Sequence, residues 1–475
     1  MTIATENTTA SRPEYASGFE TLSDERMIDR LPLDGELPDW LDGSLLRTGP
    51  ARFEVGEEPY RHWFDGLTML HRFSFSGGEV SYGNRFLRGR SWRKAEATGK
   101  IPFREFATDP CRSLFGRVQS LFSPGFGDNA NINVVRLGER FLSMTEAPIS
   151  VQFDPRTLEA AGAGVEPPGV LTTAHPHLDR SSKGMLNFAA HLGARTEYRF
   201  FRIAPDADEP QVIARIPARK TGYVHSFGLT ERHIILAEFP WVLNPIKLAL
   251  SGRPYAENYA WEPDRGTRIF LIDRDSGEAT GPIVTDPMFA FHFVNAYEDA
   301  DGTIVADLSA FEDASIVERL YLDRLRSGGG VPDVALRRLR IDPREETIQI
   351  ERLIDAPFEL GQINYGRCNE RPYRYAWGVG AVEDGWFDTI VRADVEARSE
   401  LTWSEPGCYP GEPVFVAAPD AAEEDEGVLL SVVLDATAQT SFLLVLDARD
   451  LGELCRARVP HAIPFHFHGQ FSRGV

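Results

Sequence analysis

The sequence is poor in cysteine and in basic charge, and both shortages exclude classes of protein. Four cysteines occur among 475 residues, at positions 111, 368, 408 and 455, with no CxxC pair. This usage fits reduced thiols in a cytosol better than a disulfide-linked scaffold. Fifty Lys and Arg stand against 71 Asp and Glu, a formal net charge of −21. Because nucleic-acid binding depends on basic groups that displace counterions from phosphate, this balance argues against a nucleic-acid partner.

Long apolar runs are also missing. No window reaches the ~18 uninterrupted apolar residues of a transmembrane helix, and residues 1–17 lack the basic end and apolar stretch of a secretory signal. We therefore expect a cytoplasmic protein that is at most peripherally attached to a membrane surface.

What the sequence does contain is a series of short apolar and alternating segments typical of β-strands. Residues 71–75 and 79–82 alternate on either side of Gly77-Gly78, which predicts a hairpin with a glycine turn. Residues 234–237 and 428–434 are more continuously apolar, and they predict buried strands.

Helices are predicted to be few. The apolar spacing predicts one helix over residues 109–122 and a second over 315–326, which ends at Gly328-Gly329-Gly330. Residues 239–250 are apolar as well, but two prolines make this segment too irregular for a core helix.

A weak internal repeat runs along the chain. In each copy the end of an apolar strand meets an aspartate that opens a turn, and a second strand follows; the aspartates are Asp154, Asp273, Asp342 and Asp447. Their spacing suggests a unit of roughly 50–70 residues with some copies too degraded to see. Repeated β-units of this size favour a propeller in one domain. The alternative is that such turns are common in any β protein.

Four of the 11 histidines stand on or next to short apolar strands, at positions 175, 225, 292 and 468. A single histidine of this kind is more often a hydrogen-bonded structural residue. As a set, these four are spaced so that several propeller blades would each point one imidazole at a shared axis. Neutral imidazoles suit iron, zinc or copper, and an all-imidazole site with open positions fits an Fe(II) centre.

Motifs around these histidines resemble the carotenoid cleavage oxygenases, most closely the animal-type branch with the β-carotene oxygenases and the retinal pigment epithelium isomerohydrolase. The matching stretches, in order, are GSLLRTGP (43–50), HWFDG (62–66), TAHPH (173–177), VHSFGLTE (224–231), FHFVNAYED (291–299), FELGQINY (358–365), GEPVFV (411–416) and IPFHFHG (463–469). They cover almost everything beyond residue 40.

The resemblance implies an all-β fold: a seven-bladed β-propeller in which a few short helices and loops form a cap over an axial iron site. Residues 1–18 would be a flexible tail and residues 19–475 the propeller domain. One Fe(II) per chain would be held by the catalytic histidines His175, His225, His292 and His468, with O₂ as co-substrate.

Two further histidines, His177 and His466, each lie two residues from a proposed ligand. In a strand, each would share the ligand's face but sit about 7 Å along it. The family pattern selects the histidine directly before Gly469, which is His468.

In the family, three glutamates fix the outer nitrogens of the iron-binding histidines, and the matching residues are Glu146, Glu359 and Glu412. Each lies in an apolar strand motif, where an unpaired carboxylate would be costly to bury. The sequence departs from the family at Leu360-Gly361, where members commonly carry a proline. It also places Ile132 where several cleaving members have a small hydroxyl residue near the open iron position.

Carotenoids are insoluble in water, so the resemblance also implies collection of the substrate from a bilayer. The segments 109–122 and 239–250 correspond to the family's membrane-facing rim. We expect the anchors in the second segment to be Trp241, Leu243, Ile246 and Leu248.

The resemblance therefore predicts a dioxygenase that splits a conjugated C=C bond of a carotenoid or apocarotenoid into aldehyde or ketone products. Three alternatives stay open. One is a non-oxidative isomerohydrolase acting on a retinyl ester. Another is a stilbene-cleaving dioxygenase, with Tyr60 and Lys94 as conceivable phenol-binding residues. The third is a carotenoid-binding propeller without chemistry.

Overall fold

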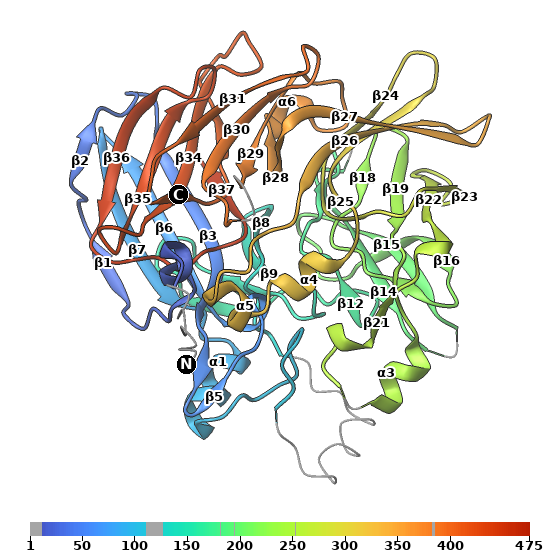
Figure 1. The fold of residues 1–475 in the computed structure, drawn as a ribbon, viewed down its shortest axis with the longest axis horizontal. Helices are drawn as coiled ribbons and strands as arrows, with labels where there is room; N and C mark the ends of the chain where they lie inside the picture. The colour runs from blue at the N-terminus through green and yellow to red at the C-terminus, as the bar shows by residue number, and fades with distance from the viewer. Residues whose placement is uncertain (1–11, 111–126, 181, 194, 252, 382–384) are drawn as a thin grey trace, which may run out of the picture.

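The computed structural model describes residues 12–110, 127–180, 182–193, 195–251, 253–381 and 385–475. Nearly all regular structure in these ranges is β-strand, and seven sheets of four to six strands surround a common centre (Figure 1). The innermost strands touch one another in turn in the order β18, β24, β28, β33, β37 and β8. The expected seven-bladed β-propeller is therefore confirmed.

In each blade the strands lie side by side, and they are listed here from the outer edge of the molecule to its centre. From the edge inward, the first blade has β1 (Arg26–Ile28), β7 (Glu79–Phe86), β6 (Leu67–Ser76), β3 (Gly43–Arg52) and β37 (Gly469–Ser472). The second has β11 (Ala160–Ala163), β10 (Val151–Phe153), β9 (Arg140–Met144) and β8 (Asn133–Leu137). The third has β16 (Gln211–Pro217), β15 (Glu197–Ile203), β14 (Met185–His191), β12 (Leu171–Thr172) and β13 (His177–Leu178).

The remaining blades follow the same order. The fourth has β23 (Ala279–Thr285), β22 (Thr267–Asp273), β19 (His233–Glu238) and β18 (Gly228–Leu229). The fifth has β27 (Thr347–Pro357), β26 (Val334–Asp342), β25 (Ile304–Phe311) and β24 (Phe289–Glu298). The sixth has β31 (Ser399–Ser404), β30 (Thr389–Asp394), β29 (Tyr375–Gly380) and β28 (Glu359–Ile363). The seventh has β2 (Leu33–Gly35), β36 (Glu453–Val459), β35 (Thr440–Asp447), β34 (Gly427–Asp435), β32 (Cys408–Pro410) and β33 (Val414–Ala417).

Short elements complete the described chain. Two small sheets contain β4 (Glu54–Val55) with β5 (Glu58–Pro59), and β17 (Thr221–Gly222), β20 (Trp241–Leu243) and β21 (Tyr259–Trp261). The α-helices are α1 (Arg90–Thr98), α3 (Pro245–Ser251), α4 (Ser315–Arg319), α5 (Leu322–Arg326) and α6 (Tyr365–Cys368). The 3-10 helices are η1 (Glu14–Phe19), η2 (Trp63–Asp65), η3 (Ala256–Asn258) and η4 (Pro263–Arg265).

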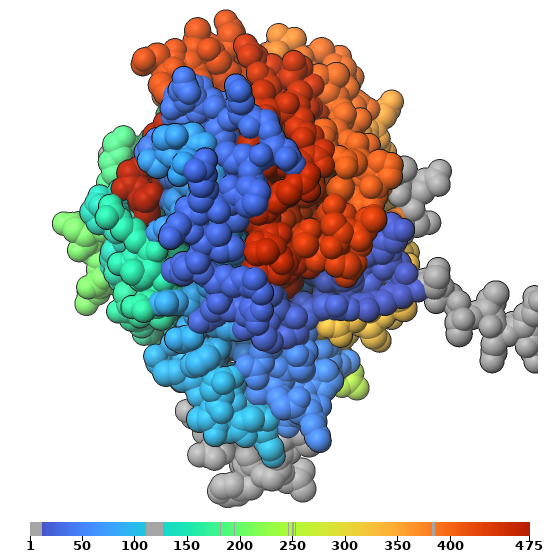
Figure 2. All heavy atoms as spheres, turned by 90° about the vertical axis from the view of Figure 1, so that its left-hand side faces the viewer, coloured from blue at the N-terminus to red at the C-terminus, as the bar shows by residue number. Residues whose placement is uncertain are grey.

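The ring is closed by strands from both ends of the described chain. β37 pairs with β3 in the first blade, in a register that joins Arg47 to Gly469, and β2 pairs with β36 in the seventh. Figure 2 shows the resulting contact of blue N-terminal with red C-terminal residues on one face. Since a closed ring leaves few exposed strand edges, this double pairing protects the sheets from pairing with other chains.

The predicted hairpin and turns are confirmed. β6 and β7 pair with Ser76 opposite Glu79, and Gly77 and Gly78 both have positive φ, as a two-residue turn of type I′ requires. In all four repeat copies the aspartate carboxylate accepts a backbone N–H two residues on, and each turn joins two strands of one blade. The repeat is therefore the same outer turn of four blades.

The helix predicted over 315–326 is in fact two short helices. Between α4 and α5, Tyr321 is extended and forms a β-bridge with His62. The Tyr321 and His62 rings also contact each other edge-on. This tertiary contact interrupts the helical pattern. The helix predicted over 109–122 lies almost entirely outside the described residues.

The expected N-terminal tail also contains regular structure. Residues 14–18 of the expected tail belong to η1, where Tyr15 and Phe19 pack against Trp386. In the described ranges, no helix combines the length and apolar character needed to cross a membrane.

The prediction that Trp241 and Leu243 are membrane anchors is wrong. They lie in β20 with 8% and 0% of their surface exposed, and Trp241 stacks on Tyr259. Leu248 in α3 is half-buried against the core, and the side chain of Ile246 lies outside what the structure describes.

Packing of the blades should dominate stability. Leu444 in β35 is fully buried, whereas Leu401 in β31 is 45% exposed. We expect Leu444→Ala to lower the free energy of unfolding by about 2–5 kcal/mol, because it leaves a cavity. The matched Leu401→Ala should change it by no more than about 0.5 kcal/mol. Urea unfolding followed by tryptophan fluorescence measures both, and equal losses would contradict this assignment of the core.

Candidate metal centre

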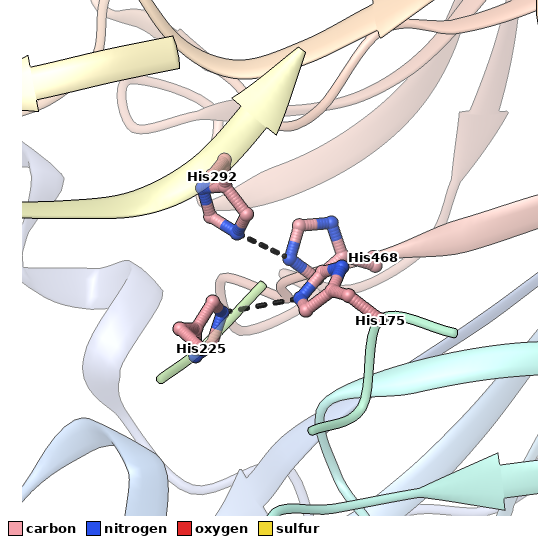
Figure 3. A group of neighbouring side chains, drawn as sticks. All are labelled: His175, His225, His292 and His468. Atoms are coloured by element: carbon pink, nitrogen blue, oxygen red, sulfur yellow. Dashed lines mark hydrogen bonds between the residues drawn. The ribbon is translucent and has the colours of Figure 1, made fainter. Parts of the chain in front are cut away.

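Four histidines from four blades meet at the centre of the propeller (Figure 3). His292 lies in β24, and His468 directly precedes β37. His175 lies between β12 and β13, and His225 lies between β17 and β18. Each imidazole therefore lies in or next to an inner strand of a different blade, as the spacing of the histidines predicts.

The ring nitrogens converge on one point. The Nε2 atoms of His175 and His225 are 3.1 Å apart, and those of His292 and His468 are also 3.1 Å apart. One ligand nitrogen from each of the four rings lies within 4.8 Å of all the others. Three of the four side chains are buried and His175 is half-buried.

The outer nitrogens of three rings are held by carboxylates. His225 Nδ1 lies 2.6 Å from Glu146 Oε1, His292 Nδ1 lies 2.7 Å from Glu359 Oε2, and His468 Nδ1 lies 2.7 Å from Glu412 Oε1. An ionised carboxylate only accepts, so each Nδ1 carries the proton and each Nε2 presents a lone pair. The expected pairing of the three glutamates with these histidines is present in the structure.

This arrangement fits a cation. His292 and His468 are both protonated on Nδ1, so their Nε2 lone pairs face each other across 3.1 Å with no proton to share, and these lone pairs repel. A metal ion placed among the four nitrogens relieves that repulsion and accepts all four lone pairs. A set of imidazoles without thiolates or directly ligating carboxylates suits a borderline divalent metal such as iron.

Burial favours the neutral form of His175, His225 and His468, because it lowers the pKa of each. It lowers the pKa of His468 to about 4, although Glu412 opposes the shift, and it lowers the pKa of His175 well below its usual range. Burial also raises the pKa of Glu359, but His292, the Leu360 N–H and His468 together outweigh burial and leave that pKa below its ordinary value. Neutral imidazoles beside ionised carboxylates are the protonation states that metal binding needs.

Glu412 is the most firmly held of the three carboxylates. Arg47 Nη1 lies 3.4 Å from Glu412 Oε2 and its side chain is 1% exposed. Gln362 Nε2 donates to Oε1 at 2.8 Å, and the Gly469 N–H donates to Oε2 at 2.9 Å. A buried arginine and two further donors thus orient the carboxylate that orients His468.

Glu146 has one additional partner. The Tyr223 hydroxyl donates to Glu146 Oε1 at 2.6 Å, on the same oxygen that His225 contacts. Arg47, Gln362 and Tyr223 are absent from the residues proposed from the sequence. Of these, Arg47 carries a signal, because a charged residue inside the apolar run 43–50 predicts a buried ion pair.

The departure at Leu360-Gly361 still supports the site. Leu360 has a positive φ of 51°, and its N–H donates to the carboxylate of Glu359. A Cβ on Gly361 would lie 2.8 Å from Phe358 and from Val294. The local backbone therefore adds a donor to Glu359, and glycine is required for the close packing beside it.

The neighbouring candidates occupy other positions. His466 packs against the His71 ring, with 4.3 Å between centroids, and is not part of the four-histidine group. His177 Nε2 instead lies 2.9 Å from the carbonyl of Phe227. The Ile132 carbonyl accepts the His468 N–H at 3.2 Å, so its backbone adjoins the centre. Lys94, which lies on α1, has its ammonium group over the Phe103 ring.

Comparison with known proteins agrees with this geometry. The family model described as "Retinal pigment epithelial membrane protein" (RPE65) matches residues 19–473. The chain belongs to this family. A carotenoid isomerooxygenase of Galleria mellonella is 34% identical over 92% of both chains. A β,β-carotene 15,15'-dioxygenase of Mus musculus is also 34% identical, over 92% of this chain and 88% of that protein.

Solved structures of this family share the fold. An ACO/RPE65 chimera has a TM-score of 0.86 with 26% identity, covering 97% of this chain and 98% of the other. A cobalt-substituted Synechocystis ACO has the same TM-score and coverage, with 25% identity. The second of these carries cobalt, by its name.

The carboxylate partners should control metal affinity. Glu359→Gln preserves the shape of the side chain but removes the charge that faces His292, so we expect metal to bind about 10–100-fold more weakly. Competition with a chelator, read as bound iron, measures this. The control is Glu298→Gln, since Glu298 makes a similar 2.8 Å contact with His233 outside the centre. Equal loss in both variants would contradict a specific role for Glu359.

Proposed function

We propose that this chain is an Fe(II)-dependent dioxygenase that cleaves a conjugated C=C bond of a carotenoid or apocarotenoid with O₂, giving aldehyde or ketone products. The observation that carries the proposal is the convergence of four imidazole nitrogens at the centre of the propeller. The names of the relatives, which include a carotenoid dioxygenase, support the reaction class.

The metal ligands in this proposal are His175, His225, His292 and His468, with one iron per chain. The three glutamates keep each outer Nδ1 protonated and each ring oriented. Bound Fe(II) supplies the redox chemistry that activates O₂ for insertion across the double bond. These four imidazoles would hold the ion without any carboxylate ligand, as in an all-imidazole site that can take a further ligand.

Aromatic rings beside the histidines support a polyene substrate. Phe291 lies 5.2 Å from His225, Phe64 lies 6.0 Å from Phe291, and Phe467 lies 5.1 Å from Phe64, all between ring centroids. A flat conjugated chain packs well against such faces and edges.

For the location we propose a cytoplasmic protein that meets the membrane surface peripherally. Of the two expected rim segments, 109–122 lies almost entirely outside the described residues. In 239–250, with Trp241 and Leu243 buried, α3 (Pro245–Ser251) is the part left for this contact. An apolar patch can attach locally even though the net charge of −21 opposes anionic lipid, because screening limits that repulsion to about 8–10 Å.

The deciding experiment incubates the iron-loaded protein aerobically with carotenoids, apocarotenals, a retinyl ester and stilbenes. We expect one O₂ consumed for each polyene cleaved into two carbonyl products, identified by mass. Ester hydrolysis without O₂ uptake would identify an isomerohydrolase instead, and absence of any reaction would contradict the proposal.

The ligand set makes a second prediction. His292→Ala should abolish both iron retention and cleavage, because it removes one of four ligand nitrogens and leaves Glu359 without its partner. Bound iron by metal analysis and product by mass are the two readouts. His233→Ala, in the His233–Glu298 pair outside the centre, should retain both the iron and the cleavage activity. Full activity in His292→Ala would disprove the ligand assignment.

We further propose that the Ile132 side chain borders the open iron position and restricts it. Its carbonyl already bonds to the ligand residue His468. Ile132→Thr should then strengthen binding of nitric oxide, a stable stand-in for O₂, measured by electron paramagnetic resonance of the iron-loaded protein. Ile132→Val is the matched control and should change binding less. Unchanged binding in the threonine variant would place Ile132 away from the open position.

A further inference from the structure

Two tyrosines next to the centre form a phenol pair with one proton to spare. Tyr255 precedes η3 and Tyr259 begins β21, and their hydroxyls hydrogen-bond to each other. Two O–H groups share a single bond, so one hydroxyl proton is left over whichever phenol donates. In the described part of the chain, no other protein group hydrogen-bonds to either hydroxyl.

The surroundings of this pair are aromatic. Tyr259 is 8% exposed and stacks on Trp241 with 4.4 Å between centroids and 26° between planes. Tyr255 contacts Phe106 at 6.2 Å. An O–H donor that faces aromatic rings finds no acceptor on them of the strength of an oxygen atom. A ligand that brings an oxygen supplies that acceptor.

The pair is connected to the metal centre by direct ring contacts. The ring centroids of Tyr259 and Tyr223 are 5.9 Å apart, and those of Tyr223 and His225 are 6.1 Å apart. Tyr223 also bonds to Glu146, the carboxylate that holds His225. The phenols are therefore joined to the metal ligand His225 by two successive ring contacts.

The phenols remain protonated donors. Burial raises the pKa of Tyr255 well above its usual range and also raises that of Tyr259. The negative charge of Glu146 raises the pKa of both phenols further, which agrees with their position near that carboxylate. Both groups therefore stay uncharged phenols, which donate or accept a hydrogen bond without losing their proton.

We propose that the Tyr255–Tyr259 pair binds an oxygen at the end of the polyene, so that the substrates are apocarotenoids or hydroxylated carotenoids rather than hydrocarbons. This inference rests on the proposed function. A terminal carbonyl or hydroxyl oxygen accepts the spare proton, whereas a hydrocarbon end leaves it unpaired. Sites that hydrogen-bond a substrate oxygen reject analogues without it far more strongly than an apolar pocket rejects an added group.

The test measures binding without turnover. Iron-loaded protein is kept anaerobic and titrated in detergent with an apocarotenal, a hydroxylated carotenoid and β-carotene, and quenching of tryptophan fluorescence gives each Kd. We expect the double variant Tyr255→Phe/Tyr259→Phe to raise Kd about five- to tenfold for the two oxygenated ligands, as loss of a hydrogen bond predicts. Its Kd for β-carotene should change less than about twofold, since a hydrocarbon makes no such bond.

Phenylalanine keeps both rings and their packing, and each single variant, which leaves one free phenol, should show a smaller loss than the double. The matched control is Tyr297→Phe, a buried tyrosine in a separate hydrophobic cluster, which should leave every Kd unchanged. Loss for one oxygenated ligand alone would identify carbonyl or hydroxyl as the group bound. Equal losses for oxygenated and hydrocarbon ligands, or no loss at all, would overturn the inference.

Failure of this inference is distinguishable from failure of the proposed function. Under air, the double variant should show a raised KM for the oxygenated substrates with little change in kcat. Cleavage that proceeds equally well on both ligand classes in the wild type and the double variant disproves the end-group role and leaves the dioxygenase intact. Selective binding of oxygenated ligands without cleavage by the wild type or any variant supports the end-group role and disproves the dioxygenase activity.

Discussion

The site depends on one electrostatic arrangement: imidazole lone pairs aimed at a common point by carboxylates behind them. Each of Glu146, Glu359 and Glu412 fixes the proton on Nδ1 of its histidine, which leaves Nε2 available. Rings arranged in this way repel one another unless a cation lies between them. The protein therefore needs a rigid frame that holds the repelling groups in place before the ion binds.

The propeller supplies that frame. Each ligand lies in or next to an inner strand of a different blade, so the position of each ring is set by a sheet packed between two neighbours. Closure of the ring by β37 against β3 also sets His468, because that histidine directly precedes β37. Arg47 lies on β3 opposite Gly469 and bonds to Glu412, which joins ring closure and carboxylate orientation in one place.

Local patterns predicted local features well. The Gly77-Gly78 hairpin and the aspartate turns depend on backbone conformations encoded within a few residues. The four histidines and three glutamates were predictable because each lies in a motif shared with the family. Gln362 was missed because it reaches Glu412 from another blade, and no local pattern encodes that contact. Arg47 was missed although its place in an apolar run indicates a buried ion pair; the run does not show which carboxylate it meets. The burial of Trp241 and Leu243 was also missed, because apolar residues of a core and of a membrane anchor have the same composition.

The charges around the imidazoles select the valence of the ion that the centre accommodates. Glu146, Glu359 and Glu412 contribute three negative charges, and the buried Arg47 contributes one positive charge. The four neutral ligands add none, so these groups together carry a net charge of minus two. A divalent ion makes this interior neutral, whereas a monovalent or trivalent ion leaves an unbalanced charge in surroundings where charge is expensive. The same carboxylates and arginine that orient the ligands thus match the centre to a doubly charged metal.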